Sequence, residues 1–172
     1  MNNLQLSTAS QPLFVEQAAE RYLIANPITL EQICSIASDL LAQYFQYGEG
    51  LTSPAKTVQY LQSKLAMREH EVFSCIFLNS QHQVLAYEEL FNGTIDSASV
   101  YPREVVKRVL HHNAAAVILS HNHPSGAPEP SQADQKITKR LQEALRLVDV
   151  NVLDHIVIGG ADTVSFSELG FL

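Results

Sequence analysis

The segment from Ser120 to Asp134 constrains this chain more than any other, because it combines histidine, proline and acidic residues directly after an apolar run. The run, residues 114–119, is typical of a buried strand, and a helical pattern follows the segment. His121 and His123 therefore lie at a predicted strand-to-helix turn, with Asp134 in the first turn of the helix. Such a turn can bring two imidazoles and one carboxylate together, so the segment predicts a metal site.

The ligand types indicate which metal to expect. Two imidazole nitrogens and one carboxylate oxygen suit zinc better than calcium or magnesium, which prefer oxygen ligands. Three protein ligands leave a fourth tetrahedral position for water, whereas structural zinc sites are normally closed by four protein ligands. The pattern therefore favours a catalytic Zn2+ site. An alternative stays open, in which the histidines are solvated and Ser131 with Asp134 caps the helix, although capping and metal binding can coexist.

A linked set of motifs resembles the bacterial RadC family and, within it, the JAMM (MPN-plus) metalloprotease motif. The JAMM pattern is present as His121-x-His123-Pro124, followed by Ser131-x-x-Asp134. The match to the RadC family runs from about Arg68 to Leu172. The motifs that carry it are Gly93-Thr94, Tyr101-Pro102-Arg103-Glu104-Val105, Ala115-Ala116, His121-Asn122-His123-Pro124-Ser125-Gly126, Pro130-Ser131 and Leu153-Asp154-His155-Ile156.

The resemblance implies a role for each matching residue. His121, His123 and Asp134 match the metal ligands of the JAMM motif. Glu71 matches the glutamate that acts as general base and proton shuttle, and Ser131 matches the serine that stabilises the oxyanion. Judged by residue type and position alone, Glu71 could equally be a solvated acid at the start of a strand, and Ser131 could be a helix cap.

Three regions are expected along the chain: a disordered leader over residues 1–11, a helical segment over 12–67, and a RadC-like JAMM/MPN domain over 68–172. The helical segment should contain helices over 12–25 and 29–47, with Thr29 as a possible N-cap, and a third helix from Pro54 to near Met67. It does not resemble the helix-hairpin-helix segment at the front of longer RadC proteins. Packing against the main domain is the expected role of these helices.

The third region alternates strands with helices. This alternation predicts an α/β fold with a mixed β-sheet flanked by helices, and the resemblance implies JAMM/MPN-like layering similar to that of cytidine deaminases. Ligands in such sheets favour the carboxyl ends of strands, where His121 lies. The expected strands cover residues 72–78, 84–91, 115–120, 151–158 and 164–166, and the expected helices begin at Tyr101 and cover 132–148.

Charge and cysteine content limit the partners and the compartment. A net charge of −7 provides no overall basic field for a nucleic acid, and the basic residues of the predicted helices are interpreted as solvated faces. Cys34 and Cys75 are too few for a disulfide framework or for the paired-cysteine signature of zinc deaminases. The polar start lacks a signal peptide or membrane span, so the expected compartment is the cytoplasm. The basic residues in question are Lys107, Arg108, Lys136, Lys139, Arg140 and Arg146.

The expected function is zinc-dependent hydrolysis of a peptide or isopeptide bond, with a protein or peptide as substrate. One alternative is a non-catalytic accessory protein for DNA repair or mobile-element maintenance, which would bind DNA or protein without its metal ligands. A metallo-nuclease is favoured less, because the chain is acidic and predicts a single metal. His155 is left out of the ligand set; it could hydrogen-bond in the core or support a ligand from behind.

Overall fold

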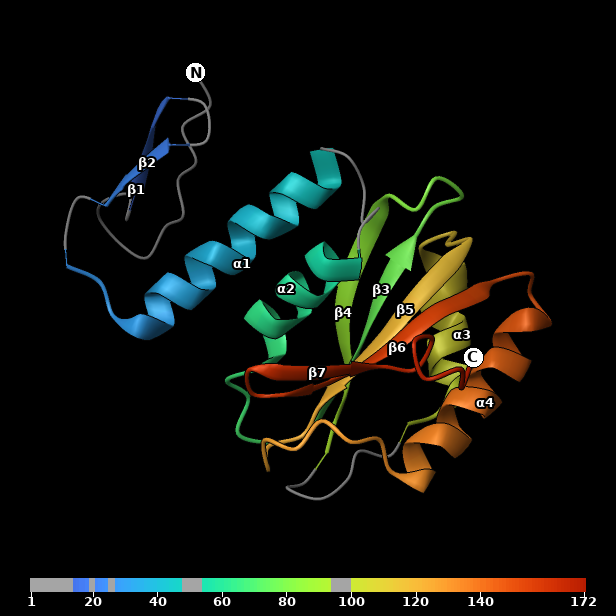
Figure 1. The fold of residues 1–172 in the computed structure, drawn as a ribbon. Coiled ribbons are helices and arrows are strands. Elements are labelled where there is room, and N and C mark those ends of the chain that lie inside the picture. Colours follow the sequence, from blue (N-terminus) through green and yellow to red (C-terminus); the bar gives the residue numbers. More distant parts are fainter. Residues whose placement is uncertain (1–13, 19–20, 25–26, 48–53, 94–99) are drawn as a thin grey trace. The chain divides into compact units, whose positions relative to one another are not determined.

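The computed structural model describes residues 14–18, 21–24, 27–47, 54–93 and 100–172 (Figure 1). The chain divides into two compact units, residues 1–37 and 38–172, and the second contains a five-stranded sheet. The parallel pair β5–β6 is flanked by antiparallel strands, so the sheet is mixed, as expected. In spatial order the strands are β4 (Val84–Asn92), β3 (Val72–Leu78), β5 (Ala116–Asn122), β6 (Asn151–Gly159) and β7 (Asp162–Ser165).

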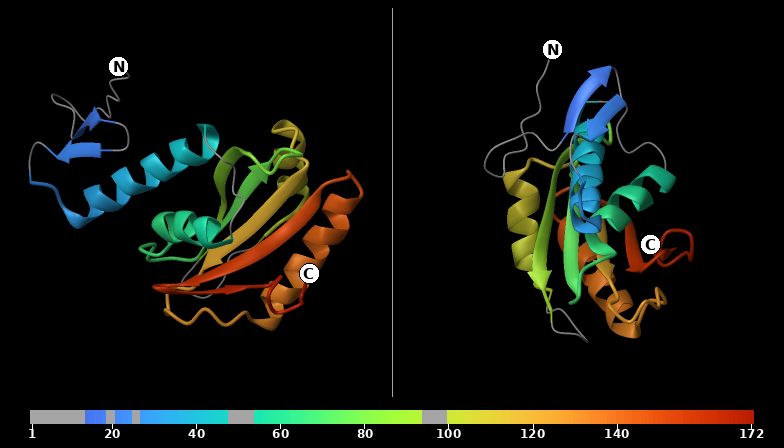
Figure 2. Two further views of the ribbon diagram at one scale, coloured as in Figure 1. Left: turned by 45° about the horizontal axis from the view of Figure 1, so that its top comes forward. Right: turned by 90° about the vertical axis from the view of Figure 1, so that its left-hand side faces the viewer.

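Helices cover both faces of this sheet (Figure 2). Helix α2 (Pro54–Leu65) packs on one face, where Leu61 and Leu65 join the alternate strand residues that point toward them. Helices α3 (Pro102–His111) and α4 (Gln132–Arg146) pack on the other face. Every residue of β3 and β5 is buried, as expected for central strands covered on both sides. The predicted α/β fold class is confirmed.

The first predicted helix is wrong. Residues 12–25 were expected to be helical, but the structure has two antiparallel strands there, β1 (Phe14–Ala18) and β2 (Arg21–Ile24). Both strands contain aromatic and β-branched residues, which favour extended backbone, and a stretch this short does not separate a helical period from a strand period. Residues 12–13, 19–20 and 25 lie outside the described residues, as does the expected leader over 1–11.

The second predicted helix is confirmed as α1 (Leu30–Tyr47). Thr29 caps it, because the Gln32 backbone N–H donates to Thr29 Oγ1 at 3.2 Å. The Gln32 side chain completes a capping box by accepting from the Thr29 backbone N–H at 2.8 Å. In the part of the chain that the structure describes, no helix combines the length and the apolar character needed to cross a membrane.

Strand β5 extends further than its sequence predicts. It was expected to end at Ser120, but it runs to Asn122, so His121 lies within the strand and not in the following turn. The reason is pairing on both sides: His121 lies opposite Phe73 of β3 and Val157 of β6. The first histidine of the motif is therefore held by a rigid sheet.

A half-buried ion cluster joins β4 to α3. Glu88 accepts hydrogen bonds from Arg108, with the Nε bond at 2.6 Å, and lies 2.7 Å from His112 Nε2. The hydrogen bonds from Arg108, followed by the contact with His112, outweigh burial and lower the pKa of Glu88 from 4.5 to about 2.

The Glu88 cluster predicts a pH-dependent contribution to stability. In the folded protein Glu88 stays ionised down to about pH 2, whereas the unfolded chain takes up this proton near pH 4.5. Its contribution is therefore complete above pH 4.5 and is lost as the pH falls toward 2. Glu88→Gln should lower the free energy of unfolding by about 1–3 kcal/mol at pH 7, and by much less at pH 3, in urea denaturation.

A control for this prediction is Glu89→Gln. Glu89 pairs with Arg68, whose side chain is 45% exposed, and exposed pairs of this kind contribute at most about 1 kcal/mol. Equal losses in the two variants at pH 7, or a Glu88 effect that does not change with pH, would contradict the assignment of stability to the Glu88 cluster.

Candidate metal centre

Three predicted ligands converge in the structure. One ligand atom from each of His121, His123 and Asp134 lies within 4.8 Å of the others. The two Nε2 atoms are 3.0 Å apart, and the Asp134 carboxylate oxygens lie 3.6 Å from His121 Nε2 and 3.8 Å from His123 Nε2. Tetrahedral ligands at 2.0–2.1 Å from an ion are separated by about 3.3–3.4 Å, so this group can hold a metal ion.

Strand alternation places the two histidines on one face. His121 and His123 are two residues apart, and the extended backbone continues past the end of β5, because the His123 N–H donates to Ile158 O at 2.8 Å. Both rings therefore point to the side of the sheet that α4 covers. The loop then passes over Gly159, where an added Cβ would lie 2.6 Å from Gly126 O. This close approach explains why glycine is needed at the end of β6.

Asp134 combines the two roles that the sequence left open. Its Oδ2 accepts from the backbone N–H of Ser131 at 2.7 Å and from the Ser131 hydroxyl at 2.6 Å, while Ser131 Oγ accepts from the Asp134 N–H at 3.1 Å. This is a capping box at the start of α4. Oδ1 is the oxygen that faces His121. One carboxylate can thus cap the helix and offer a ligand.

Electrostatics keep this carboxylate ionised. Burial on its own raises the pKa of Asp134, but contacts with His121, His123 and Ser131 outweigh it and hold the pKa well below its usual range. The contact between Asp134 and His123 also acts on the histidine, because the hydrogen bond to Asp134 is the main cause that raises the pKa of His123. A negative charge beside two imidazole nitrogens favours the binding of a divalent cation.

The Nδ1 atom of each imidazole, on the side of the ring away from the other ligands, also has a hydrogen-bond partner. His123 Nδ1 lies 2.7 Å from Ala127 O, so Nδ1 carries the proton and donates it to the carbonyl, which leaves Nε2 free to bind a metal. His121 Nδ1 lies 2.8 Å from His155 Nε2. His155 is fully buried, and burial is the main cause that lowers its pKa well below the usual value. His155 is therefore a neutral support behind a ligand, one of the two roles that its sequence allowed.

Asp154 is not a ligand in this arrangement. Its Oδ1 accepts from the backbone N–H groups of His155 and Ser167, and its Oδ2 accepts from the Ser165 hydroxyl. These bonds fix the end of β7 against β6, so that Phe166 lies with its ring centroid 4.7 Å from that of His155. The acid next to His155 therefore has a structural role.

Glu71 lies directly before β3 and is half-buried. Its charge is one of the causes that raise the pKa of His123, so its carboxylate is close enough to interact with this ligand. The Glu71 carbonyl also accepts from the Gly93 N–H at 2.8 Å, which holds the end of β4 next to it. The position is compatible with the expected general base, and that role stays a prediction.

Asn122 is a residue that the sequence analysis missed. It stands between the two histidines but points to the opposite face of the sheet, where it is 2% exposed. Its Oδ1 accepts from the Val72 N–H at 2.8 Å, and its Nδ2 donates to the carbonyls of Arg68 and His70. Asn122 therefore ties the end of β5, between the two histidines, to the backbone on each side of Glu71. The sequence does contain a signal for this role. Asn122 follows an apolar run that is typical of a buried strand, and a buried amide needs hydrogen-bond partners.

Comparison with known proteins identifies the family. A family model described as a RadC-like JAB domain matches residues 51–171, which is more than half of the chain. The chain belongs to the RadC family. A UPF0758 protein of Vibrio parahaemolyticus is 51% identical over 168 residues, which cover 98% of this chain and 74% of that relative. A UPF0758 protein of Vibrio cholerae is 51% identical over 152 residues, covering 88% of this chain and 96% of the relative.

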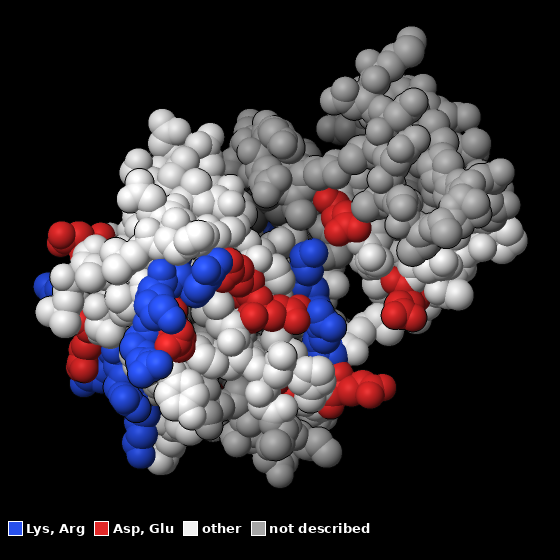
Figure 3. Space-filling view, turned by 180° about the vertical axis from the view of Figure 1, so that it is seen from behind, with Lys and Arg blue, Asp and Glu red and all other residues white. Residues whose placement is uncertain are grey.

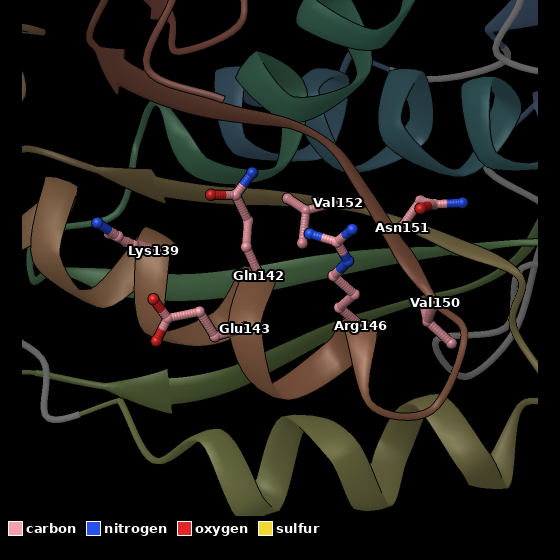
Figure 4. A pocket seen from close by; sticks show the side chains of 7 residues that line it. All are labelled: Lys139, Gln142, Glu143, Arg146, Val150, Asn151 and Val152. Atoms are coloured by element: carbon pink, nitrogen blue, oxygen red, sulfur yellow. The ribbon is translucent and has the colours of Figure 1, made fainter.

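The RadC domain also has a groove at the other end of α4 (Figure 4). Its volume is about 500 Å³, and its residues come from the last turns of α4 and the start of β6, away from the metal ligands. Seen from behind, the face over α3 and α4 shows Lys and Arg side chains gathered among Asp and Glu (Figure 3). The lining residues are Lys139, Gln142, Glu143, Arg146, Val150, Asn151 and Val152.

Proposed function

We propose that this RadC protein is a zinc-dependent hydrolase that cleaves a peptide or isopeptide bond. The observation that carries the proposal is the group of three ligand atoms from His121, His123 and Asp134. Their separations suit a tetrahedral ion, and three protein ligands leave one position for water or substrate. When bound, zinc lowers the pKa of a coordinated water to about 7 and polarises a carbonyl.

The other residues of the site would move protons and stabilise charge. Glu71 would take the proton from the attacking water and return it to the leaving amine. Ser131 would donate a hydrogen bond from its hydroxyl to the oxyanion that forms when water adds to the carbonyl. In this structure the Ser131 hydroxyl donates a hydrogen bond to Asp134 Oδ2, with 2.6 Å between the two oxygens, so it must rotate away from Asp134 to reach a substrate.

A second candidate function rests on the exposed face of α4. Lys136, Lys139, Arg140 and Arg146 are exposed there, and the described residues provide none of them with an ion-pair partner within 4.0 Å. Unpaired cations beside a groove favour an anionic partner, such as a nucleic acid in an accessory role. The net charge of −7 favours the hydrolase over this candidate.

One experiment separates the two functions. Zinc-loaded wild type and His123→Ala would each be incubated with a library of peptides and isopeptide-linked peptides, and with labelled DNA. Cleavage of peptide bonds by the wild type alone would support the hydrolase. DNA binding that is equal in both proteins, without cleavage of any substrate, would favour the accessory role. Cleavage of DNA by the wild type alone would replace the hydrolase by a nuclease.

Ser131 provides a separate prediction, because two substitutions distinguish capping from catalysis. Alanine at an N-cap costs about 0.5–2 kcal/mol of stability, whereas glycine costs only a few tenths. If Ser131 stabilises the oxyanion, both variants should hydrolyse substrate about 100- to 1000-fold more slowly, while only Ser131→Ala loses stability clearly. Thermal unfolding and initial rates measure the two effects. A Ser131→Gly variant with an unchanged rate would leave Ser131 as a cap alone.

A further inference from the structure

A chain of three hydrogen bonds links two of the three candidate ligands through buried side chains. His121 Nδ1 lies 2.8 Å from His155 Nε2, and His155 Nδ1 lies 2.6 Å from Thr138 Oγ1. Thr138 Oγ1 in turn donates to the backbone carbonyl of Asp134 at 2.6 Å. The side chains of His121, His155 and Thr138 are each at most 2% exposed, so water does not compete for these bonds.

The direction of every proton in this chain follows from its last bond. A carbonyl has no proton, so the single hydroxyl proton of Thr138 is used in the bond to Asp134 O. Thr138 Oγ1 must then accept a hydrogen bond from the Nδ1–H of His155. A neutral imidazole has one N–H, so His155 Nε2 is an acceptor and His121 Nδ1 is the donor. His121 Nε2 is left with a free lone pair on the side of the metal site.

The His155 ring is fixed in the orientation that this chain needs. Phe73 and Phe166 pack edge-on against it, with ring centroids at 5.5 Å and 4.7 Å. Asp154 holds the His155 backbone N–H at 2.7 Å. A ring held in this way offers its two nitrogens in fixed directions, one toward α4 and one toward β5.

We propose that Thr138 and His155 are positioning residues that hold His121 in the tautomer that can bind a metal. This inference rests on the proposed zinc site and adds to it the residues that prepare one of its ligands. Asp134 is a ligand through its side chain, and its backbone carbonyl sets the tautomer of the other ligand, His121. The helix turn from Asp134 to Thr138 therefore contributes to the site twice.

Removing the Thr138 hydroxyl should reverse the direction of the hydrogen bond between His155 and His121. In Thr138→Val, His155 Nδ1 would be a buried N–H without an acceptor, and buried N–H groups are rarely left without one. His155 would move its proton to Nε2 and donate it to His121 Nδ1, and His121 would then carry its proton on Nε2, where the metal should bind. Valine has the shape of threonine, and the lost bond to the residue one turn earlier is not one that stabilises helices. Thr138→Ser keeps the hydroxyl and is the matched control.

Two measurements test the proposal. Competition with a chelator should give a zinc affinity about 10- to 100-fold weaker for Thr138→Val than for wild type, and close to wild type for Thr138→Ser. In metal-free protein at about pH 9, where imidazoles are neutral, proton–nitrogen correlation spectra report which ring nitrogen of His121 carries the proton. The proton is expected on Nδ1 in wild type and Thr138→Ser, and on Nε2 in Thr138→Val.

The tautomer measurement does not depend on zinc, so the two proposals can fail separately. A wild-type spectrum with the His121 proton on Nε2 would overturn the positioning role, even if Thr138→Val failed to fold. A Thr138→Val variant with unchanged tautomer and unchanged affinity would overturn it as well. Wild type that takes up no zinc would end the zinc proposal, while the spectra would still decide whether Thr138 and His155 set the tautomer of His121.

Discussion

His123→Ala is expected to lose the metal ion, so that zinc content falls from close to one per chain in the wild type to almost none. The variant removes one of only three protein ligands, and the remaining pair, His121 and Asp134, leaves two positions of a tetrahedral ion to water. We expect the affinity to fall by more than the factor of about 10–100 that follows loss of a supporting residue. Mass spectrometry on protein purified without added metal measures the content.

His123 is the better of the two histidines for this test. Its side chain is 20% exposed and His123 lies just past the end of β5, so alanine leaves the core intact. His121 is 1% exposed and stacks on Phe73, and its loss would confuse metal binding with folding.

The control for metal loss is His111→Ala. His111 is exposed at the end of α3, and the contact described for it is with the ring of His112. This variant should keep the wild-type zinc content. Wild type that neither contains nor takes up zinc would refute the zinc proposal and leave the accessory role as the leading candidate. Equal zinc content in wild type and His123→Ala would show that zinc binds at another site.

The convergence of the three candidate ligands could be predicted because they are local in sequence. Two histidines directly after a predicted strand, and an acid in the first turn of the next helix, lie near the same end of that strand. The fourteen-residue span from His121 to Asp134 therefore contains all three ligands. The capping box could be predicted for the same reason, since Ser131 and Asp134 are three residues apart.

The supporting residues could not be predicted in this way. Asn122 contacts backbone groups about fifty residues earlier, and His121 meets His155, which lies 34 residues later. Such contacts depend on strand order and register, which periodicity does not give. The hairpin of β1 and β2 was missed for a different reason, because strands of five and four residues are too short to show a clear period.

Glu71→Gln is expected to lower the rate of hydrolysis by about 100- to 10,000-fold while zinc stays bound, because an amide cannot accept the proton from water. The metal should be retained, since Glu71 is not among the three residues whose ligand atoms converge. The measurement is the initial rate on a peptide found in the library, with zinc content determined on the same samples. Equal zinc and a slow rate together would place the defect in proton transfer.

Glu69→Gln is the matched control for Glu71→Gln. Glu69 is exposed, lies two residues earlier and carries the same charge, so this variant changes the net charge equally without removing the proposed base. It should keep the wild-type rate. Asn122 holds the Arg68 and His70 carbonyls and the Val72 N–H, so the backbone around Glu71 is fixed and a change of one side chain should not move it. A slow rate in Glu71→Gln could therefore not be attributed to a shifted backbone, whereas an undiminished rate would exclude Glu71 as the base.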